Sequence, residues 1–276
     1  MTEFRGRARF WAYVTTAVVC LIVAAPFAWI FINSIKNQID IYTGTLSFTP
    51  VWTNYDDLLF GRRSDFLLNV QNSAIVASAS TILVMIVGTL AAYSLSRFRL
   101  ARWFAAGFLA WTLVFHMIPP ITLVGPWYLT FRELGLFNTL SGLVLTHVTI
   151  NLPMTIWLMM SFFQDVPKEL EEAALIDGCR RVGAFLRVSL PLAVPGLVAA
   201  GILAFIFSWN EFSIALNLTT SETATVPVGI ARFAQQYEVR HGEMASASVL
   251  ATVPALVLMF VGQRFIVKGL TLGSLK

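Results

Sequence analysis

LGLFNTLSGLVLTHVTINLPMTIWLMMSFFQ (134–164) and VSLPLAVPGLVAAGILAFIFSWN (188–210) are two runs of sequence without a single Asp, Glu, Lys or Arg. Each exceeds the roughly 20 residues that an α-helix needs to cross about 30 Å of hydrocarbon. Between them lies DVPKELEEAALIDGCRRVGAFLR (165–187), which is too polar to lie in lipid and too short to form a domain. This alternation predicts two membrane-spanning helices joined by a short loop in water.

The whole chain of 276 residues continues this pattern. Apolar residues make up 57% of it and charged residues only 12%, against about 45–50% and about 25% in soluble domains. So few charges cannot cover a soluble globule of this length, which excludes a water-soluble enzyme. We expect one all-α membrane domain over residues 1–276, with six spans at 10–35, 68–95, 103–131, 138–163, 190–216 and 244–266.

Basic residues predict the orientation of these spans. An even number of spans puts both termini on one side, and that side holds thirteen of the nineteen Lys and Arg residues, against six on the other. Cytoplasmic loops carry such an excess. Both termini and the loop 165–187 are therefore expected in the cytoplasm, and the loop 217–243 outside. The first span is expected to be an uncleaved signal anchor, because it is too long for the core of a signal peptide.

The cytoplasmic loop predicts a short helix with an acidic rim. Asp165 is a suitable N-cap, Pro167 suits the first turn, and Gly178 suits the end. Lys168, Glu169, Glu171 and Glu172 are expected on polar faces, and Leu170, Ala173, Ala174 and Asp177 on another. The acidic residues argue against a helix lying on anionic lipid. A transporter energised by a separate soluble subunit needs a docking element of this kind.

Several kinds of chemistry are missing from the sequence. A phosphate-binding loop needs a Gly-Lys-Ser/Thr sequence, and none of the four lysines follows a glycine. The three histidines, His116, His147 and His241, do not have the spacing of a metalloprotease helix. We therefore expect no catalytic, cofactor or metal site in this chain, and any use of ATP must come from a partner. Nucleic-acid binding is not expected, because the basic residues form no stripe.

Glu172-Ala173-Ala174, then Gly178, then Val188, Leu190 and Pro191 resemble the EAA motif (EAA-x3-G-x9-I-x-LP) of ABC importer permeases, with Val188 in place of Ile. Trp209-Asn210-Glu211-Phe212 and the tail Lys268-Gly269-Leu270-Thr271 with Gly273 are similar to the carbohydrate branch that contains the smaller permease of the maltose importer. Within this branch the chain most resembles the second permease subunits of actinobacterial trehalose importers.

The resemblance implies a type I importer permease in a bacterial plasma membrane, surrounded by lipid. The implied partners are a second permease subunit, two copies of a cytoplasmic ATPase that bind ATP and Mg²⁺, and an extracellular sugar-binding lipoprotein. The loop would dock in a cleft of the ATPase, with Glu172 reaching a basic residue there. The predicted coupling residues are Glu169, Glu172, Ala173, Ala174, Asp177, Gly178 and Pro191.

Polar residues within the spans are costly in lipid and often mark cavities. Asn151, Trp209, Asn210 and Glu211 are the candidate pathway or gate residues. Hydrogen bonding between helices is expected for His116 and His147, and a proton relay through Glu211 or His116 is the alternative. In the related maltose importer the transmembrane sugar site belongs mainly to the partner permease, so few sugar contacts are expected here.

The outer loop 217–243 is too long for a simple connector. In the maltose-type family, the corresponding loop enters the sugar cleft of the binding protein. By this resemblance, the stretch 226–236 is expected to contact the binding protein, through Val226, Pro227, Val228, Gly229, Ile230 and Phe233. A loop resting only on this permease is the alternative.

Three other functions are alternatives to a permease of a sugar importer. An ion-coupled secondary transporter would leave the EAA-like loop unexplained and lacks paired charges within the spans. An ABC permease for another oligosaccharide or for a glycerol phosphate fits the same motifs, because the sequence does not identify the substrate. A membrane enzyme would need a nucleophile with its base or a metal-ligand cluster, and the sequence shows neither.

Overall fold

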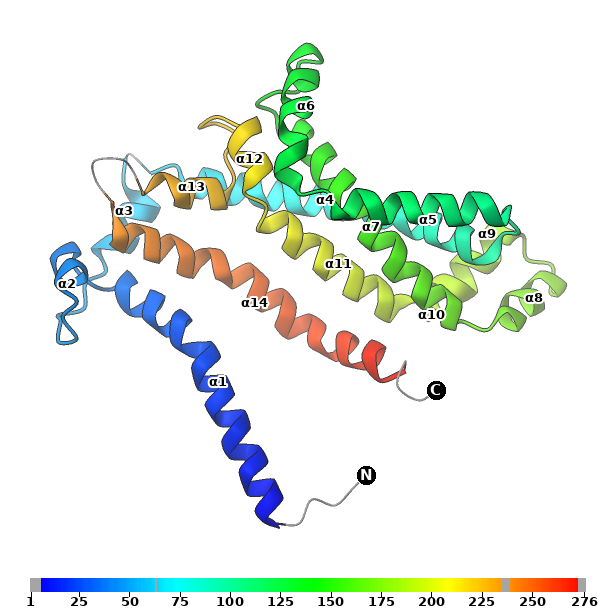
Figure 1. Ribbon diagram of the computed structural model, residues 1–276, viewed down its shortest axis with the longest axis horizontal. Helices are drawn as coiled ribbons and strands as arrows, with labels where there is room; N and C mark the ends of the chain where they lie inside the picture. The colour runs from blue at the N-terminus through cyan, green and yellow to red at the C-terminus, as the bar shows by residue number, and fades with distance from the viewer. Residues whose placement is uncertain (1–5, 63, 235–238, 273–276) are drawn as a thin grey trace. The chain divides into compact units, whose positions relative to one another are not determined.

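The computed structural model describes residues 6–62, 64–234 and 239–272, with the side chains of 7 and 264–272 left aside. Within these ranges the chain is helical and the only β-type pairing is an isolated bridge between Ala234 and Val239. Figure 1 follows the helices in order. They are α1 (Gly6–Ser34), α2 (Gln38–Thr43), α3 (Thr53–Phe60), α4 (Phe66–Arg97), α5 (Arg102–Met117), α6 (Pro120–Glu133), α7 (Leu140–Asp165), α8 (Lys168–Ile176), α9 (Arg181–Ala184), the π-helix η1 (Phe185–Ser189), α10 (Leu190–Leu192), α11 (Val194–Trp209), α12 (Ser213–Leu218), α13 (Val226–Arg232) and α14 (His241–Leu272).

The chain divides into two compact units. The first consists of Met1–Leu67 and Gly229–Val253, and the second of Leu68–Val228 and Pro254–Lys276. The candidate site residues of the cytoplasmic loop and of the spans belong to the second unit. The outer loop contributes residues to both units, because the division falls after Val228.

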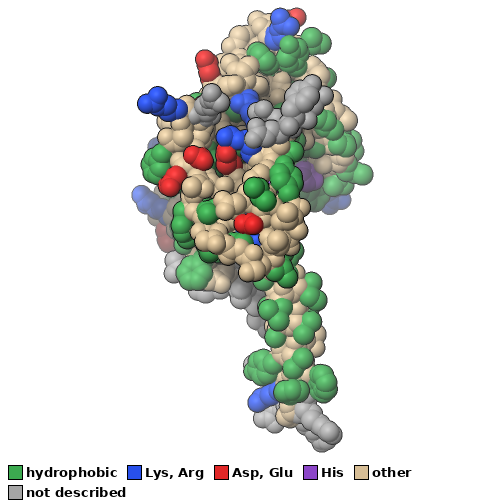
Figure 2. Space-filling model, turned by 90° about the vertical axis from the view of Figure 1, so that its left-hand side faces the viewer, with side chains coloured by type: hydrophobic (Ala, Val, Ile, Leu, Met, Phe, Trp, Pro, Cys, Tyr) green, Lys and Arg blue, Asp and Glu red, His purple; other side chains and the backbone are tan. Residues whose placement is uncertain are grey.

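In the first unit, α1 carries apolar side chains on its surface along its length (Figure 2). A helix that is apolar all round is typical of a membrane span. Its last residue, Ser34, is buried and bonded to Tyr55, with 2.8 Å between the two hydroxyl oxygens. The Ser34 carbonyl accepts a bond of 2.9 Å from the Asn54 amide and one of 3.2 Å from the Ser246 hydroxyl. These bonds fix the end of α1 against α3 and the start of α14.

The second unit has two apolar clusters along α4 and α7. One contains Val76 of α4, Leu143 and Val144 of α7, and Ile214 and Leu218 of α12. The other contains Ala92 and Tyr93 of α4, Met159 and Phe163 of α7, and Phe185 of η1. In Figure 1, α11 lies beside α7. The two clusters therefore hold α4 and α7 in place at opposite ends of these long helices.

The close approach of α4 to α7 depends on a residue without a side chain. A Cβ atom at Gly88 would lie 2.8 Å from Cγ2 of Thr155 on α7. Carbon atoms do not approach so closely in a well-packed interior. Glycine at this position therefore permits the two helices to meet.

In the part of the chain that the structure describes, four helical segments are long and apolar enough to cross a membrane: Ala8–Ser34, Phe66–Arg97, Leu140–Asp165 and His241–Gln263. Two further candidates are bent pairs, Arg102–Met117 with Pro120–Glu133 at 96°, and Arg181–Leu192 with Val194–Trp209 at 75°. The total is six when each bent pair is one span. The helical fold expected from the sequence is confirmed, although the third and fifth expected spans are broken helices.

Prolines explain both breaks. Ile118 precedes Pro119 and has ψ 122°, and Pro119 itself has ψ 130°, so neither is helical. The residue before a proline avoids the α region, and Pro120 then starts α6 where its missing N–H is not needed. In the second pair, Ala193 is the C-cap residue that follows α10, and it has ψ 3°. Pro195 cannot bond the carbonyl of Pro191, and its ring clashes there.

Candidate functional site

The cytoplasmic loop forms the expected short helix, α8, but it begins differently from the expectation. Asp165 is the last residue of α7, and the N-cap position of α8 is Pro167, which makes no side-chain capping bond. The expectation that Asp165 caps this helix was therefore wrong. An uninterrupted α7 uses Asp165 in its own last turn, and only the two residues Val166 and Pro167 separate the helices.

The end of α8 is as expected. Gly178 has φ +90°, a conformation that side chains disfavour. The N–H of Cys179 donates to the Ala174 carbonyl at 3.0 Å, and the N–H of Gly178 donates to the Leu175 carbonyl at 3.2 Å. These two bonds form a Schellman motif, which satisfies carbonyls left free at a helix end. The motif turns the chain sharply after α8.

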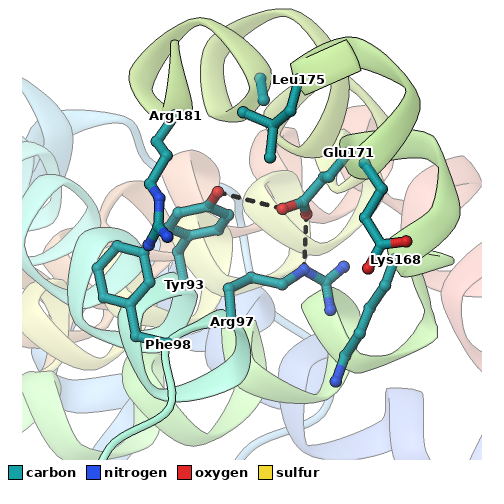
Figure 3. A pocket seen from close by; sticks show the side chains of 9 residues that line it. Tyr93, Arg97, Phe98, Lys168, Glu171, Leu175 and Arg181 are labelled. Carbon is teal, nitrogen blue, oxygen red and sulfur yellow. Dashed lines mark hydrogen bonds and ion pairs between the residues drawn. The ribbon is translucent and has the colours of Figure 1, made fainter.

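Glu171 differs most from the sequence-based expectation. It was assigned to a polar face, yet it is only 7% exposed. Its Oε1 accepts a bond from Nε of Arg97 at 2.6 Å, and its Oε2 accepts one from the Tyr93 hydroxyl at 3.2 Å (Figure 3). Oε1 also accepts a bond of 2.5 Å from the Ser189 hydroxyl. A buried carboxylate is tolerated only when paired and hydrogen-bonded. Three donors, one of them the Arg97 cation, meet that need here.

A cavity of about 210 Å³ lies beside this ion pair. Arg97, Glu171 and Arg181 line it together with Lys168 and Glu172 (Figure 3). The guanidinium of Arg181 lies over the Phe98 ring, 5.5 Å from its centroid. The cavity is therefore bordered by both signs of charge, at the junction of α4, α8 and α9.

The predicted coupling residues lie mostly on the surface of this loop. Glu169, Glu172, Ala173, Asp177 and Gly178 are exposed, Ala174 is half-buried, and Pro191 is exposed on α10. Ile176, at the end of α8, is 86% exposed. Acidic and apolar side chains thus alternate on the exposed part of α8, as on a surface that another protein covers.

A second, larger cavity of about 440 Å³ lies among α5, α6, α7 and the α11–α12 junction. Three of the four predicted pathway residues line it, namely Asn151, Asn210 and Glu211, and so does His116. The rings of Phe115, Phe207 and Phe212 form part of its apolar wall. Its size is in the range of small-molecule sites, which are lined mainly by apolar groups with a few polar ones.

Trp209, the fourth predicted pathway residue, does not line this cavity. It is 4% exposed, and its ring stacks on Phe205 with 5.8 Å between centroids. Because successive helical residues point 100° apart, the neighbours Trp209 and Asn210 face different surroundings. Trp209 belongs to the packing of α11, and only Asn210 and Glu211 reach the cavity.

A buried polar chain starts at Glu211. His147 on α7 is fully buried, with Nε2 at 3.7 Å from Oε2 of Glu211 and Nδ1 at 2.5 Å from the Ser208 hydroxyl. The Ser208 hydroxyl lies 2.9 Å from that of Ser80 on α4. His147 therefore bonds between helices, as expected from the sequence. Nε2 has no hydrogen-bond partner among the described residues.

The outer loop is held firmly at its base. The Asn72 amide donates to the carbonyls of Glu222 and Ala224, each at 3.0 Å. The N–H of Val226 donates to the Ser73 hydroxyl at 2.8 Å. These bonds seat residues 222–226 on α4.

Beyond this base, the predicted contact residues differ in access. Val226 and Val228 are 1% exposed, and Val228 belongs to the first apolar cluster. Gly229 is also buried, whereas Pro227, Ile230 and Phe233 are half-buried. Residues 235 and 236 of the expected contact stretch lie outside the described residues, as does Gly273 of the tail. Of the six predicted contact residues, Pro227, Ile230 and Phe233 are therefore the accessible ones.

Three site residues were missed from the sequence: Tyr93, Arg97 and Ser189, all partners of Glu171. Their local patterns are ordinary, since Arg97 ends an apolar run and Ser189 lies in another. The one available signal was the excess of acidic residues in 168–172 facing a basic residue at the end of a neighbouring span. Within the described residues, no cluster of His, Cys, Asp or Glu has the arrangement of a metal site.

Comparison with known proteins agrees with this architecture. Residues 84–272 match the family described as "Binding-protein-dependent transport system inner membrane component". The chain is 37% identical to "Trehalose transport system permease protein SugB" of Mycobacterium tuberculosis, over 98% of each chain. It is 35% identical to "Trehalose/maltose transport system permease protein MalG" of Thermococcus litoralis, over 95% of this chain and 94% of that one.

A solved structure shows the same fold. It is a "bacterial ABC transporter involved in the import of the acidic polysaccharide alginate", superposed with a TM-score of 0.78 at 21% identity, over 96% of this chain and 99% of that one. The family match covers more than half of the chain and includes α8 and the larger cavity. The protein therefore belongs to the family of binding-protein-dependent transport system inner membrane components, as a multi-pass permease subunit of an ABC transporter.

Proposed function

We propose that this permease subunit belongs to a sugar importer and that its sugar is trehalose. The observation that carries the proposal is the cavity of about 440 Å³ lined by Asn151, Asn210, Glu211 and His116. Trehalose is proposed because both named relatives have it in their names. Maltose is the nearest alternative, since one of those names includes it.

The chemistry of the cavity suits a neutral sugar. Sugar hydroxyls both donate and accept hydrogen bonds, the amides of Asn151 and Asn210 can do both, and the Glu211 carboxylate accepts them. The apolar faces of a sugar ring match aromatic walls such as those of Phe115, Phe207 and Phe212. We propose that the cavity forms this chain's part of the pathway and that a second permease subunit completes it.

We propose that α8 couples ATP hydrolysis by the ATPase to transport. Its exposed acidic residues, Glu169, Glu172 and Asp177, complement a basic cleft, and its exposed Ile176 offers apolar area. We propose that two cytoplasmic ATPase subunits bind ATP and Mg²⁺ and that one of them receives α8. An external sugar-binding lipoprotein would meet the accessible side chains of the outer loop.

Uptake in a deletion strain tests the substrate. A strain lacking this gene should regain uptake of radiolabelled trehalose when the wild-type gene is returned, and uptake should stop when ATP is depleted. It should persist under a protonophore if ATP is maintained. Restored uptake of maltose alone would overturn trehalose, and uptake that collapses with the proton gradient would support an ion-coupled carrier instead.

Copurification tests the docking role of α8. Removing a charge that is paired in a desolvated cleft costs about 2–5 kcal/mol. Glu172→Ala should therefore reduce the amount of ATPase that copurifies with a tagged permease. Glu222→Ala is the matched control, because Glu222 is an exposed glutamate in the outer loop. Equal recovery of the ATPase with both variants would contradict the docking role.

A further inference from the structure

The attachment of α8 to the rest of the second unit rests on one residue. Glu171 is the only buried residue among the nine of α8. The larger apolar side chains of this helix point outward, with Leu170 46%, Leu175 42% and Ile176 86% exposed. Apolar packing therefore contributes little to holding α8 in place, and the polar contacts of Glu171 must do so.

Those contacts reach two other elements. Tyr93 and Arg97 are one turn apart at the end of α4, and Ser189 is the last residue of η1, directly before α10 and α11. The Glu171 carboxylate accepts from all three, with Oε1 at 2.6 Å from Nε of Arg97. The side chains of Arg97 and Glu171 are 6% and 10% exposed. The pair is thus shielded from the salt that weakens surface ion pairs.

Arg97 also holds the joint that precedes α8. Its Nη2 donates to the Val166 carbonyl at 2.7 Å, in the two-residue connection between α7 and α8. One guanidinium therefore fixes both the entry to α8 and its first turn. The ends of α4, α7 and η1 all meet at this side chain or at its carboxylate partner.

We propose that Glu171 and Arg97 are positioning residues for energy coupling, which make α8 move as one body with α4 and with the segment leading into α11. The proposal rests on the docking role of α8 proposed above. Glu171 and Glu172 are adjacent, but Glu171 points inward and Glu172 is exposed. A displacement imposed on the exposed face by the ATPase then passes through Glu171 to two membrane-spanning elements.

An ion pair suits this task better than apolar contacts. Apolar surfaces slide over one another with little change in energy, because the hydrophobic effect is not directional. Hydrogen bonds to a charged group are strong and depend on geometry. A carboxylate with three donors therefore resists sliding and rotation of α8, and it does so without adding apolar surface to a loop in water.

The test uses the complete transporter in proteoliposomes with its external binding protein and labelled sugar. Glu171→Gln should leave the amount of copurified ATPase unchanged, but it should lower the sugar transported per ATP hydrolysed by roughly five- to tenfold, at the low end of typical coupling between sites. Arg97→Gln should do the same. The double variant should be no worse than either single one, because partners in one interaction are not additive.

Two milder variants keep the proposal testable if the transporters with Glu171→Gln or Arg97→Gln do not assemble. Tyr93→Phe and Ser189→Ala each remove one donor to Glu171 while leaving its charge paired. Each should lower the ratio of sugar to ATP less than Glu171→Gln does, and hydrogen exchange of the backbone amides in 168–178 should become faster. Glu222→Gln, which changes an exposed glutamate of the outer loop, is the control for both measurements.

The outcomes separate this proposal from the docking role. An unchanged ratio of sugar to ATP in Glu171→Gln, or in both milder variants if Glu171→Gln does not assemble, overturns the positioning role. Loss of ATPase copurification in Glu171→Gln equal to that in Glu172→Ala also overturns it, because Glu171 would then act in docking. If Glu172→Ala is harmless, the docking role fails independently of the Glu171 result.

Discussion

His147 and Glu211 face each other between α7 and the α11–α12 junction, with 3.7 Å between Nε2 and Oε2. Glu211 also accepts bonds from the N–H groups of Ile214 at 2.8 Å and Ala215 at 3.0 Å, at the start of α12. The same carboxylate lines the larger cavity. Glu211 therefore connects the wall of the proposed pathway to the short helix that leads toward the outer loop.

Two substitutions of Glu211 test whether its hydrogen bonds stabilise the start of α12. Glu211→Ala leaves two N–H groups of α12 without their acceptor, and loss of such a cap costs about 1–2 kcal/mol. We expect a lower melting temperature of the purified transporter in detergent. Glu211→Gln keeps an amide oxygen as acceptor, so its melting temperature should fall less. Equal melting temperatures for the two variants would show that the bonds to α12 do not stabilise the protein.

Asn210 offers a test of the cavity as a sugar pathway. Asn210→Leu removes a polar group from the cavity wall, so we expect a higher KM for sugar uptake with normal ATPase assembly. Asn217→Leu is a close control. Both amides donate to the carbonyl four residues earlier, Asn210 to Ile206 at 2.9 Å and Asn217 to Ser213 at 2.7 Å. Because Asn217 does not line the cavity, equal changes in KM would argue against a pathway there.

The turn after α8 requires glycine, and substitutions of Gly178 can test this requirement. Gly178 has φ +90°, and a left-handed backbone costs an L-residue about 1–2 kcal/mol. Gly178→Ala should shift the end of α8 and reduce copurification of the ATPase, and Gly178→Val should do so at least as strongly. Gly183→Ala is the control, since an added Cβ there would lie 3.7 Å from its nearest neighbour, an ordinary contact. Full copurification with Gly178→Ala would mean that the turn tolerates the strain.

Substitutions of accessible and of buried side chains test whether the outer loop contacts the binding protein. Ile230→Ser and Phe233→Ser change accessible side chains, so each should reduce stimulation of the ATPase by the sugar-loaded binding protein without loss of assembly. Val228→Ser changes a buried side chain of the first apolar cluster and should instead lower the melting temperature. If Ile230→Ser and Phe233→Ser leave stimulation and uptake intact, the loop is only a connector.

Sequence alone determined the features that depend on local composition. Uncharged runs longer than a bilayer is thick specify membrane helices wherever they occur. Gly178 marked the end of the short helix in the cytoplasmic loop, which is α8. These assignments succeeded because each depends on one run of residues and on the conformations that those residues permit.

Only the tertiary structure decided which polar side chains face inward. In the sequence, Glu171 and Glu172 are two equivalent acids on a polar helix, and Trp209 and Asn210 are two neighbours at the end of a span. Glu171 is buried because Arg97, 74 residues earlier, supplies a partner at 2.6 Å that offsets the cost of removing its charge from water. Asn210 reaches the cavity and Trp209 does not, because the surroundings of each are set by helices distant in sequence. A residue's burial depends on what other segments bring to it, which local patterns do not contain.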